Sequence, residues 1–388
     1  MGEGRMNDVI RIDVTKYVHG LQRVQLLKPE IRRKVMPKNV VVPDTQTTYW
    51  WHVAQLPAMN GKHHIVQYEG VIQKGSENLV HHMEVFHCEV PSNQIVPFYS
   101  GPGQSEGKPK ELEACRRVIG AWAMGATAME LPEEAGFPVG GPGFSPYVML
   151  EVHYNNPMAI KGKLDSSGIR FIVTSTLREH DAGIMELGLE YTNKMAIPPH
   201  ETLFKLTGYC IEECTEVGLP EGGIFIYASQ LHIHLTGRRV YTKHVRLGRE
   251  LPELTVTTTT ASTFKRSEGF RSPSEYFGMT CLWPGDALIT TCEDSTLNRD
   301  NATIGGFAIT DEMCVNYVHY YPVAALQVCT SSVETRALND FFTFVNKWDL
   351  DPTNPKAGDR ANYQSIRWTP RVFQSLFTGP TGLFTRLR

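Results

Sequence analysis

Short apolar runs separated by turn-forming residues dominate the pattern of this chain. Runs rich in Val, Ile, Tyr and Thr alternate with clusters of Gly, Pro, Asn and Asp, at residues 64–72, 147–154, 168–173, 223–235 and 285–292. Such runs at short intervals predict β-strands joined by tight turns. Helical patterning is sparse, and residues 111–126 form the best helix candidate. The pattern therefore predicts an all-β protein made of antiparallel sandwiches.

The length of the chain indicates more than one domain. At 388 residues it exceeds one typical hydrophobic core. A polar stretch at 161–168 is the expected linker. We therefore expect a first domain at 46–162 and a second at 163–340, with a leading segment at 1–45 and a tail at 341–388.

Charge and hydropathy exclude two classes of partner. The net charge of −3 offers no concentrated basic surface for nucleic acid. No apolar stretch approaches the roughly 20 residues of a membrane span, and residues 1–14 lack the apolar core of a signal peptide. Asn301 begins a glycosylation sequon, which matters only if the chain is secreted. The oligomeric state stays open.

Two pairs of histidines are candidate metal ligands. His232 and His234 alternate along a predicted strand, so both imidazoles point to one face and need a third donor. A thioether as that donor would favour copper over zinc, calcium or magnesium. His81 and His82 are neighbours, which face opposite ways on a regular strand and share a metal only at a bulge or a strand end. Spacing alone does not pair His153 with them.

Other histidines have ordinary interpretations. His63 and His64 repeat the spacing of His81 and His82 but lead into a Val/Ile/Tyr alternation that is typical of a strand entry. His319 lies in an apolar run, where we expect a core histidine with a hydrogen-bond partner. We expect satisfied core or surface residues at the remaining positions considered, His52, His87, His180, His200 and His244.

Four segments carry a resemblance to a known family. They read 80-VHHMEVFHCEV-90, 150-LEVHYNNP-157, 229-SQLHIHLTGRR-239 and 310-TDEMCVNYVHYYP-322. At these segments the chain resembles the copper type II, ascorbate-dependent monooxygenases, and within them the dopamine and tyramine β-hydroxylases rather than the peptide-amidating branch. By this resemblance, residues 1–45 are the remnant of an N-terminal domain.

The resemblance implies two jelly-roll-like sandwiches, each with one copper, that face one another across a solvent-filled cleft. It implies electron storage and transfer at the first copper, and oxygen binding with substrate hydroxylation at the second. The implied ligands are His81, His82 and His153 for the first copper and His232, His234 and Met313 for the second. It also implies catalytic roles for His232 and Tyr49.

The activity implied is hydroxylation of the benzylic carbon of a phenylethylamine, tyramine to octopamine or dopamine to noradrenaline, with O2 and ascorbate. Gln230 stands where the peptide-amidating branch has an arginine, which argues against amidation. An amine substrate should meet a carboxylate, and Glu186, Glu190 and Glu201 are the candidates.

Two alternatives to this activity are weighed besides peptide amidation. The first is a catalytically inactive copper-binding relative, because segment 254–278 departs most from the family. The second, zinc hydrolysis, lacks a His-Glu-x-x-His motif.

Eight cysteines allow about 105 connectivities, so spacing assigns none of them. The resemblance implies the pairs Cys88 with Cys115, Cys210 with Cys329, and Cys292 with Cys314. For Cys214 and Cys281 we expect a new bridge. Relatives carry a further bridge where this chain has Trp51 and Gly103. The resemblance implies a secretory vesicle or the extracellular space, and the cysteines suit an oxidising compartment.

Overall fold

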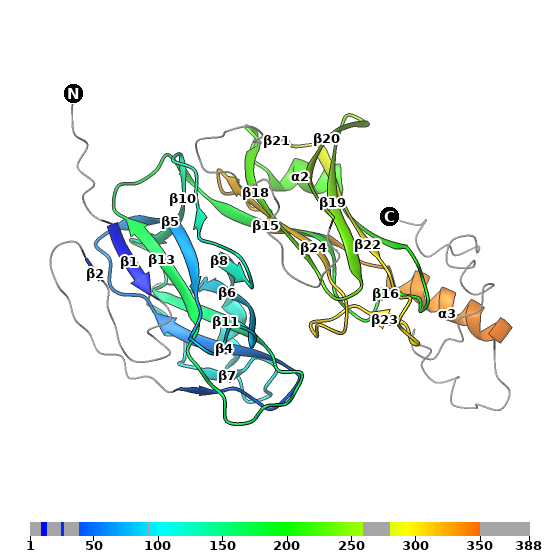
Figure 1. Cartoon of the computed structure of the whole chain (residues 1–388). Coiled ribbons are helices and arrows are strands. Elements are labelled where there is room, and N and C mark those ends of the chain that lie inside the picture. Colours follow the sequence, from blue (N-terminus) through cyan, green and yellow to red (C-terminus); the bar gives the residue numbers. More distant parts are fainter. Residues whose placement is uncertain (1–8, 14–24, 27–38, 92, 259–279, 350–388) are drawn as a thin grey trace.

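The computed structural model describes residues 9–13, 25–26, 39–91, 93–258 and 280–349 (Figure 1). Within these ranges nearly all regular structure is β-strand, arranged as two sandwiches that lie side by side. The all-β prediction is confirmed. Most of segment 254–278 and of the tail lies outside the described residues. None of the described helices is long and apolar enough to cross a membrane.

The first sandwich packs two sheets around a core that includes Tyr68, Phe137 and Phe171. One sheet comprises β1 (Val9–Asp13), β2 (Gln25–Leu26), β5 (Lys62–Val71), β9 (Met129–Glu130), β10 (Ala135–Gly140), β13 (Gly168–Thr174) and β14 (His180–Asp181). The other runs in the order β7 (Ser100–Pro102), β4 (Thr47–Gln55), β11 (Tyr147–Asn155), β6 (Val80–Cys88) and β8 (Cys115–Ala123). A short pair, β3 (Val40–Val41) and β12 (Leu164–Asp165), adjoins them.

The second sandwich has the same two-layer plan. Its first sheet runs in the order β21 (Thr280–Leu282), β18 (Ile224–Ile233), β24 (Cys314–Tyr321), β15 (Gly183–Leu189) and β25 (Val328–Ser331). Its second runs in the order β17 (Phe204–Cys210), β22 (Asp286–Asp294), β19 (Gly237–Arg246) and β20 (Arg249–Thr258). The strands β16 (Ala196–Ile197) and β23 (Thr303–Ile304) pair separately, and the helices are α2 (Glu212–Gly218) and α3 (Thr335–Asp349).

The helix expected at 111–126 is wrong. A 3-10 turn, η1 (Lys110–Ala114), leads directly into strand β8. β8 pairs with β6, and Cys115 at its start is bonded to Cys88 at the end of β6. Pairing with an available strand overrides local helix preference here, because β-structure is decided mainly by neighbours.

The first sandwich extends further along the chain than expected. β12 pairs with β3, and β13 lies between β5 and β1 in the first sandwich. Ile169, Phe171 and Val173 of β13 are fully buried in its core. The chain therefore leaves the first sandwich only after β14, and the boundary expected at 162/163 falls too early. The polar stretch at 161–168 is a loop within the first sandwich.

The two sandwiches share apolar contacts. Ile184, Ala228 and Tyr321 belong to strands of the second sandwich or their ends, yet they pack into the core cluster of the first. Strand β15 of the second sandwich lies against β8 of the first.

Candidate metal centre

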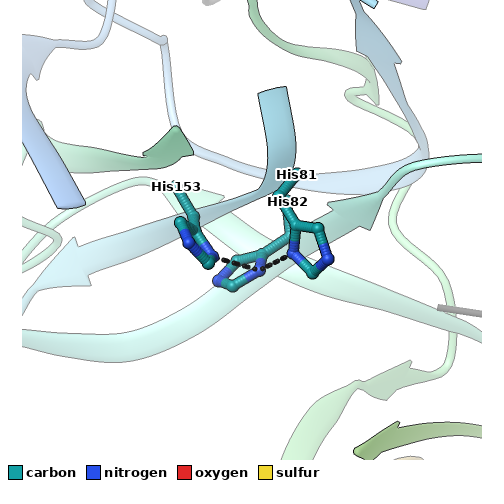
Figure 2. A group of neighbouring side chains, drawn as sticks. All are labelled: His81, His82 and His153. Atoms are coloured by element: carbon teal, nitrogen blue, oxygen red, sulfur yellow. Dashed lines mark hydrogen bonds between the residues drawn. The ribbon is translucent and has the colours of Figure 1, made fainter. Parts of the chain in front are cut away.

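Three histidines of the first sandwich converge on one point (Figure 2). His82 of β6 pairs with His153 of β11, and the register shifts at this point, so that Tyr154 pairs with Val80. His81 is the extra residue of this bulge, which frees its side chain to turn toward its neighbour. Of the two alternatives that the sequence left open, a bulge or a strand end, the structure has a bulge, which explains how adjacent residues of one strand reach one site.

The nitrogens of this group suit a metal ion. The Nδ1 atoms of His81 and His153 each lie 3.2 Å from the Nδ1 of His82, and the candidate ligand atoms all lie within 4.8 Å of one another. Two nitrogens bound at about 2.0–2.1 Å to a tetrahedral ion lie about 3.3 Å apart. Burial lowers the pKa of His81 to about 4, with a smaller contribution from His234. The imidazoles are therefore neutral at pH 7, the form that binds a metal.

A second group lies at the edge of the second sandwich. His232 is near the end of β18, and His234 follows that strand, with their Nε2 atoms 3.2 Å apart. Met313 directly precedes β24, whose Cys314 pairs with Ile233. This register brings Met313 to the same end of the sheet as the two histidines. Burial lowers the pKa of His234 to about 4, partly opposed by a hydrogen bond to the Asp311 carbonyl.

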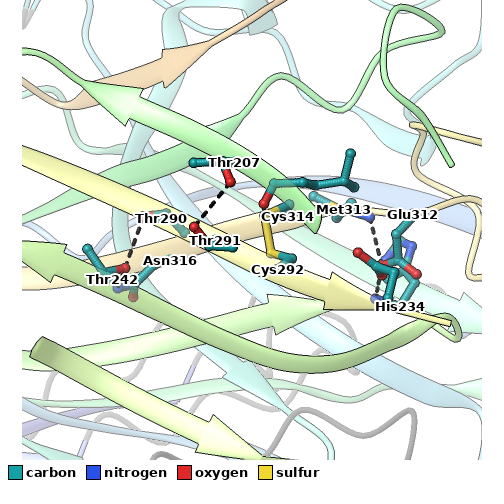
Figure 3. The surroundings of a disulfide bond; sticks show 12 residues. Thr207, His234, Thr242, Thr290, Thr291, Cys292, Glu312, Met313, Cys314 and Asn316 are labelled. Atoms are coloured by element: carbon teal, nitrogen blue, oxygen red, sulfur yellow. Dashed lines mark hydrogen bonds between the residues drawn. A yellow bond between two sulfur atoms is a disulfide. The ribbon is translucent and has the colours of Figure 1, made fainter. Parts of the chain in front are cut away.

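Glu312 joins the two segments that carry this second group (Figure 3). Its buried carboxylate accepts hydrogen bonds from the backbone N–H of His234 and Met313, and from the N–H and hydroxyl of Thr236. The disulfide Cys292–Cys314 anchors the adjoining residue to β22. Both devices fix the position of Met313 relative to His234.

The two groups lie in contact, not across a solvent-filled cleft. The rings of His82 and His232 meet edge to face with centroids 5.6 Å apart. The expectation of a solvent-filled cleft is therefore wrong for this structure, because the facing sheets pack together here and leave a cavity instead of an open cleft.

Tyr49 lies where the sandwiches meet. Its ring stacks on His153 at 4.4 Å and meets Phe307 edge to face. Its hydroxyl donates to the carbonyl of Phe307 at 2.6 Å. Burial, with Glu151 as the next cause, raises its pKa. The phenol thus remains protonated at neutral pH and ties one sandwich to the other.

A cavity between the sandwiches holds members of both groups. Its described lining is aromatic and acidic, and consists of Tyr49, His82, Glu84, Ala121, Trp122, Glu151, Tyr191, Gln230, His232, Phe307, Met313 and Tyr317. The sequence analysis missed Glu84 and Glu151. The available signal was their spacing, two residues from His82 and from His153, which places them on the same face of the sheet.

None of the three carboxylates that the sequence suggested belongs to the described lining of the cavity. Glu190 is exposed, and neither it nor Glu201 lines the cavity. Glu186 is half-buried beside the cavity, close enough to help raise the pKa of Glu84. Burial is the main cause that raises the pKa of Glu84 to about 8 and of Glu151 to about 7.

Comparison with known proteins agrees with this arrangement. Residues 33–161 match the N-terminal domain, and residues 180–342 the C-terminal domain, of the copper type II ascorbate-dependent monooxygenases. The chain is 47% identical to human dopamine beta-hydroxylase over 361 residues, which cover 90% of this chain and 57% of that protein.

This chain belongs to the copper type II ascorbate-dependent monooxygenases.

Further members of this family match over similar lengths. Tyramine beta-hydroxylase of Caenorhabditis briggsae is 42% identical over 83% of this chain and 53% of its own length. DBH-like monooxygenase protein 1 of mouse is 32% identical over 91% of this chain and 60% of its own length. The chain thus spans little more than half the length of these relatives.

The donor sets fit the copper of the family. Three imidazoles suit copper, and a soft thioether beside two imidazoles favours copper, above all Cu(I). The Nε2 of His153 is buried and has no hydrogen-bond partner among the described residues, while its Nδ1 faces the other two histidines. The ring is therefore oriented by packing, including the stacked ring of Tyr49.

The remaining histidines make other contacts. His64 pairs with Asp181 at 2.8 Å, and the Nδ1 of His63 lies 3.0 Å from the carbonyl of Gly61. His319 is buried and lies 3.2 Å from the side-chain oxygen of Gln230. The prediction of a core histidine with a hydrogen-bond partner is confirmed for His319.

The structure contains the three disulfides implied by the resemblance: Cys88–Cys115, Cys210–Cys329 and Cys292–Cys314. The bridge expected between Cys214 and Cys281 is absent, and both thiols are free. Cys214 is exposed on α2, whereas Cys281 lies on β21, where its backbone pairs with Phe225 and accepts from Arg246. Each cysteine is held by its own element, which keeps the two apart.

Proposed function

We propose that this chain is an ascorbate-dependent copper monooxygenase that hydroxylates the benzylic carbon of a phenylethylamine such as tyramine or dopamine. The observation that carries this proposal is one cavity lined by His82 of the first histidine group and by His232 and Met313 of the second. When bound, copper supplies the storage of single electrons and the reaction with O2. The protein supplies position, polarity and exclusion of water.

The residues divide these tasks. His81, His82 and His153 would hold the copper that takes electrons from ascorbate. His232, His234 and Met313 would hold the copper beside the substrate, with His232 exposed to the cavity. The aromatic rings of Tyr191, Phe307 and Tyr317 give the cavity apolar walls for a phenyl ring.

The polarity of the cavity favours an amine over a peptide carboxylate. Gln230 lies in its lining and is neutral, and two glutamates face the same space. No Lys or Arg belongs to the described lining. An anionic substrate would find no basic partner in this lining, whereas a cationic one would pair with the carboxyl groups and favour their ionised form.

Product analysis tests the proposal. Copper-loaded protein is incubated with ascorbate, O2 and an equal mixture of tyramine and dopamine, and the products are identified by mass spectrometry. Octopamine or noradrenaline supports the proposal and ranks the substrates. No product from protein that retains two coppers would instead favour an inactive copper-binding relative.

We infer a secretory location from the cysteines. Three disulfides suit an oxidising compartment, and Asn301 of the sequon is exposed. Expression in a secretory cell line should yield protein whose mass falls on deglycosylation, and Asn301→Gln should remove that difference. An unmodified Asn301 in secreted protein would contradict the inferred glycosylation.

A further inference from the structure

Two glutamates form a pair on the sheet face that carries the first histidine group. Glu84 of β6 lies directly opposite Glu151 of β11, just as His82 lies opposite His153. Each glutamate is two residues from its histidine, so all four side chains share one face of the sheet, with the two pairs about 7 Å apart. Glu84, Glu151 and His82 all line the cavity between the sandwiches.

This pair has no counter-charge. Like charges directly opposite one another on a sheet are destabilising. The described lining of the cavity includes no Lys or Arg. The nearby charged groups that act on Glu84 are Glu151 and Glu186, which are also acids. The two carboxyl groups therefore share no cation of the protein, and a bound ammonium would supply the counter-charge that favours their ionised form.

Trp51 holds one member of the pair in place. Its indole N–H donates to the Glu151 carboxylate, and Trp51 is the neighbour of Glu151 on the adjoining strand β4. A Cβ at Gly103 would lie 2.6 Å from the indole ring, so only glycine leaves room for it. Lys108 covers the ring at 4.4 Å and donates to the carbonyl of Gly103. The indole thus positions Glu151.

We infer that Glu84 and Glu151 together bind the primary ammonium group of an arylalkylamine substrate. The inference rests on the proposed function, because it assigns the amine end of the same substrate. In a phenylethylamine one methylene group separates the benzylic carbon from the ammonium nitrogen. A substrate whose benzylic carbon lies near His232 and Met313 therefore has its ammonium in the cavity that these residues line. Charge-assisted hydrogen bonds from the ammonium would bridge the two carboxylates.

Equilibrium binding tests the pair without turnover. Calorimetry on the copper-loaded chain, without ascorbate, compares tyramine with 4-propylphenol, in which a methyl group replaces the ammonium. The variants are Glu84→Gln with Glu151→Gln, each alone and both together. Glu190→Gln, an exposed glutamate of the second sandwich, is the matched control.

The wild type should bind tyramine more tightly than 4-propylphenol. The double variant should lose about 10- to 100-fold in affinity for tyramine, the scale of hydrogen bonds to charged groups, with unchanged affinity for 4-propylphenol. Trp51→Phe should give a smaller loss of the same kind. Retained 4-propylphenol binding shows that the variants are folded, and the single variants provide the same test if the double variant does not fold.

Failure of this inference and of the proposed function have different signatures. If the double variant keeps the wild-type preference for tyramine, the pair does not bind the ammonium, even if the wild type still hydroxylates tyramine. If the wild type shows no preference for tyramine, the inference is also overturned. If the wild type retains two coppers and yields no hydroxylated amine, the proposed function itself fails.

Discussion

The ring of His82 lies edge to face against the ring of His232, although each histidine belongs to a different sandwich. The ladder of β6 and β11 presents His82 at a bulge, and the end of β18 presents His232. Apolar contacts between the sandwiches hold these two regions against each other. The separation of the histidine groups is therefore a property of the interface, and residues that hold the interface should affect both groups.

Tyr49 tests this role of the interface. Tyr49→Phe keeps the ring that stacks on His153 but removes the hydroxyl that donates to Phe307. We expect the free energy of unfolding to fall by about 1 kcal/mol, the typical contribution of one hydrogen bond, with two coppers still bound. Urea unfolding and metal analysis measure both effects. As a control, Tyr99→Phe removes a comparable but exposed hydrogen bond within the first sandwich and should have a smaller effect. Equal stability of Tyr49→Phe and wild type would show that the hydrogen bond from Tyr49 to Phe307 does not hold the two sandwiches together.

Met313 tests the second donor set. Met313→Ile replaces a buried thioether by an aliphatic side chain of similar volume, so the fold should remain. We expect the copper content to fall from two per chain toward one, with hydroxylation of tyramine lost. Metal analysis and product detection measure this. His63→Ala, which alters a histidine outside both groups, should leave copper content unchanged; full hydroxylation by the Met313 variant would refute the assignment.

Glu312 tests how the second group is held. Its carboxylate accepts bonds from the backbone at His234, Thr236 and Met313. Glu312→Gln turns an oxygen into an NH2 group that faces these donors, and unmet buried donors cost about 1–3 kcal/mol. Chemical unfolding should show this loss, and metal analysis should show earlier loss of the second copper than of the first. Glu190→Gln, which is exposed, is the control; unchanged copper affinity would mean that Glu312 does not position these ligands.

The strand pattern and the histidine spacing were accessible from sequence because both depend on local periodicity. Alternation at His232 and His234 predicts one shared face, as the structure shows. Adjacency at His81 and His82 requires a bulge or a strand end, and the structure has a bulge. The convergence of His153 with His81 and His82 depends on which strands pair. No spacing along the chain contains that information, and only the family resemblance supplied it.

Errors arose where tertiary contacts outweigh local signals. The sequence pattern predicts a helix that includes residues 115–123, but these residues form a strand that pairs with β6 and is joined to it by a disulfide. The polar loop at 161–168 resembles a linker, although β13 returns to the first core behind it. The cavity acids were missed because Glu84 and Glu151 gain significance only when β6 and β11 lie side by side.

Asp286 is a buried carboxylate of the second sandwich whose interactions should contribute to stability in a pH-dependent way. Asp286 is buried at the start of β22 and accepts two bonds from Arg246 at 2.7 Å and one from the backbone of Trp283, with His244 at 2.8 Å. Burial alone would raise its pKa, but Arg246, the Trp283 N–H and His244 outweigh it and hold the pKa below 3.8.

Because the folded pKa lies below the unfolded one, the ionised Asp286 stabilises the fold fully at neutral pH, and this stabilisation is lost as the pH falls through about 4 and below. Asp286→Asn should therefore lower the free energy of unfolding by about 1–3 kcal/mol at pH 7, and the difference from wild type should shrink toward pH 3. Urea unfolding at pH 7, 5 and 3 measures this trend. Asp300→Asn, at an exposed carboxylate, should change stability by less than about 0.5 kcal/mol throughout. A difference between wild type and Asp286→Asn that stays constant from pH 7 to pH 3 would mean that the loss comes from packing, because a lost charge interaction must fade once the wild-type carboxylate is protonated.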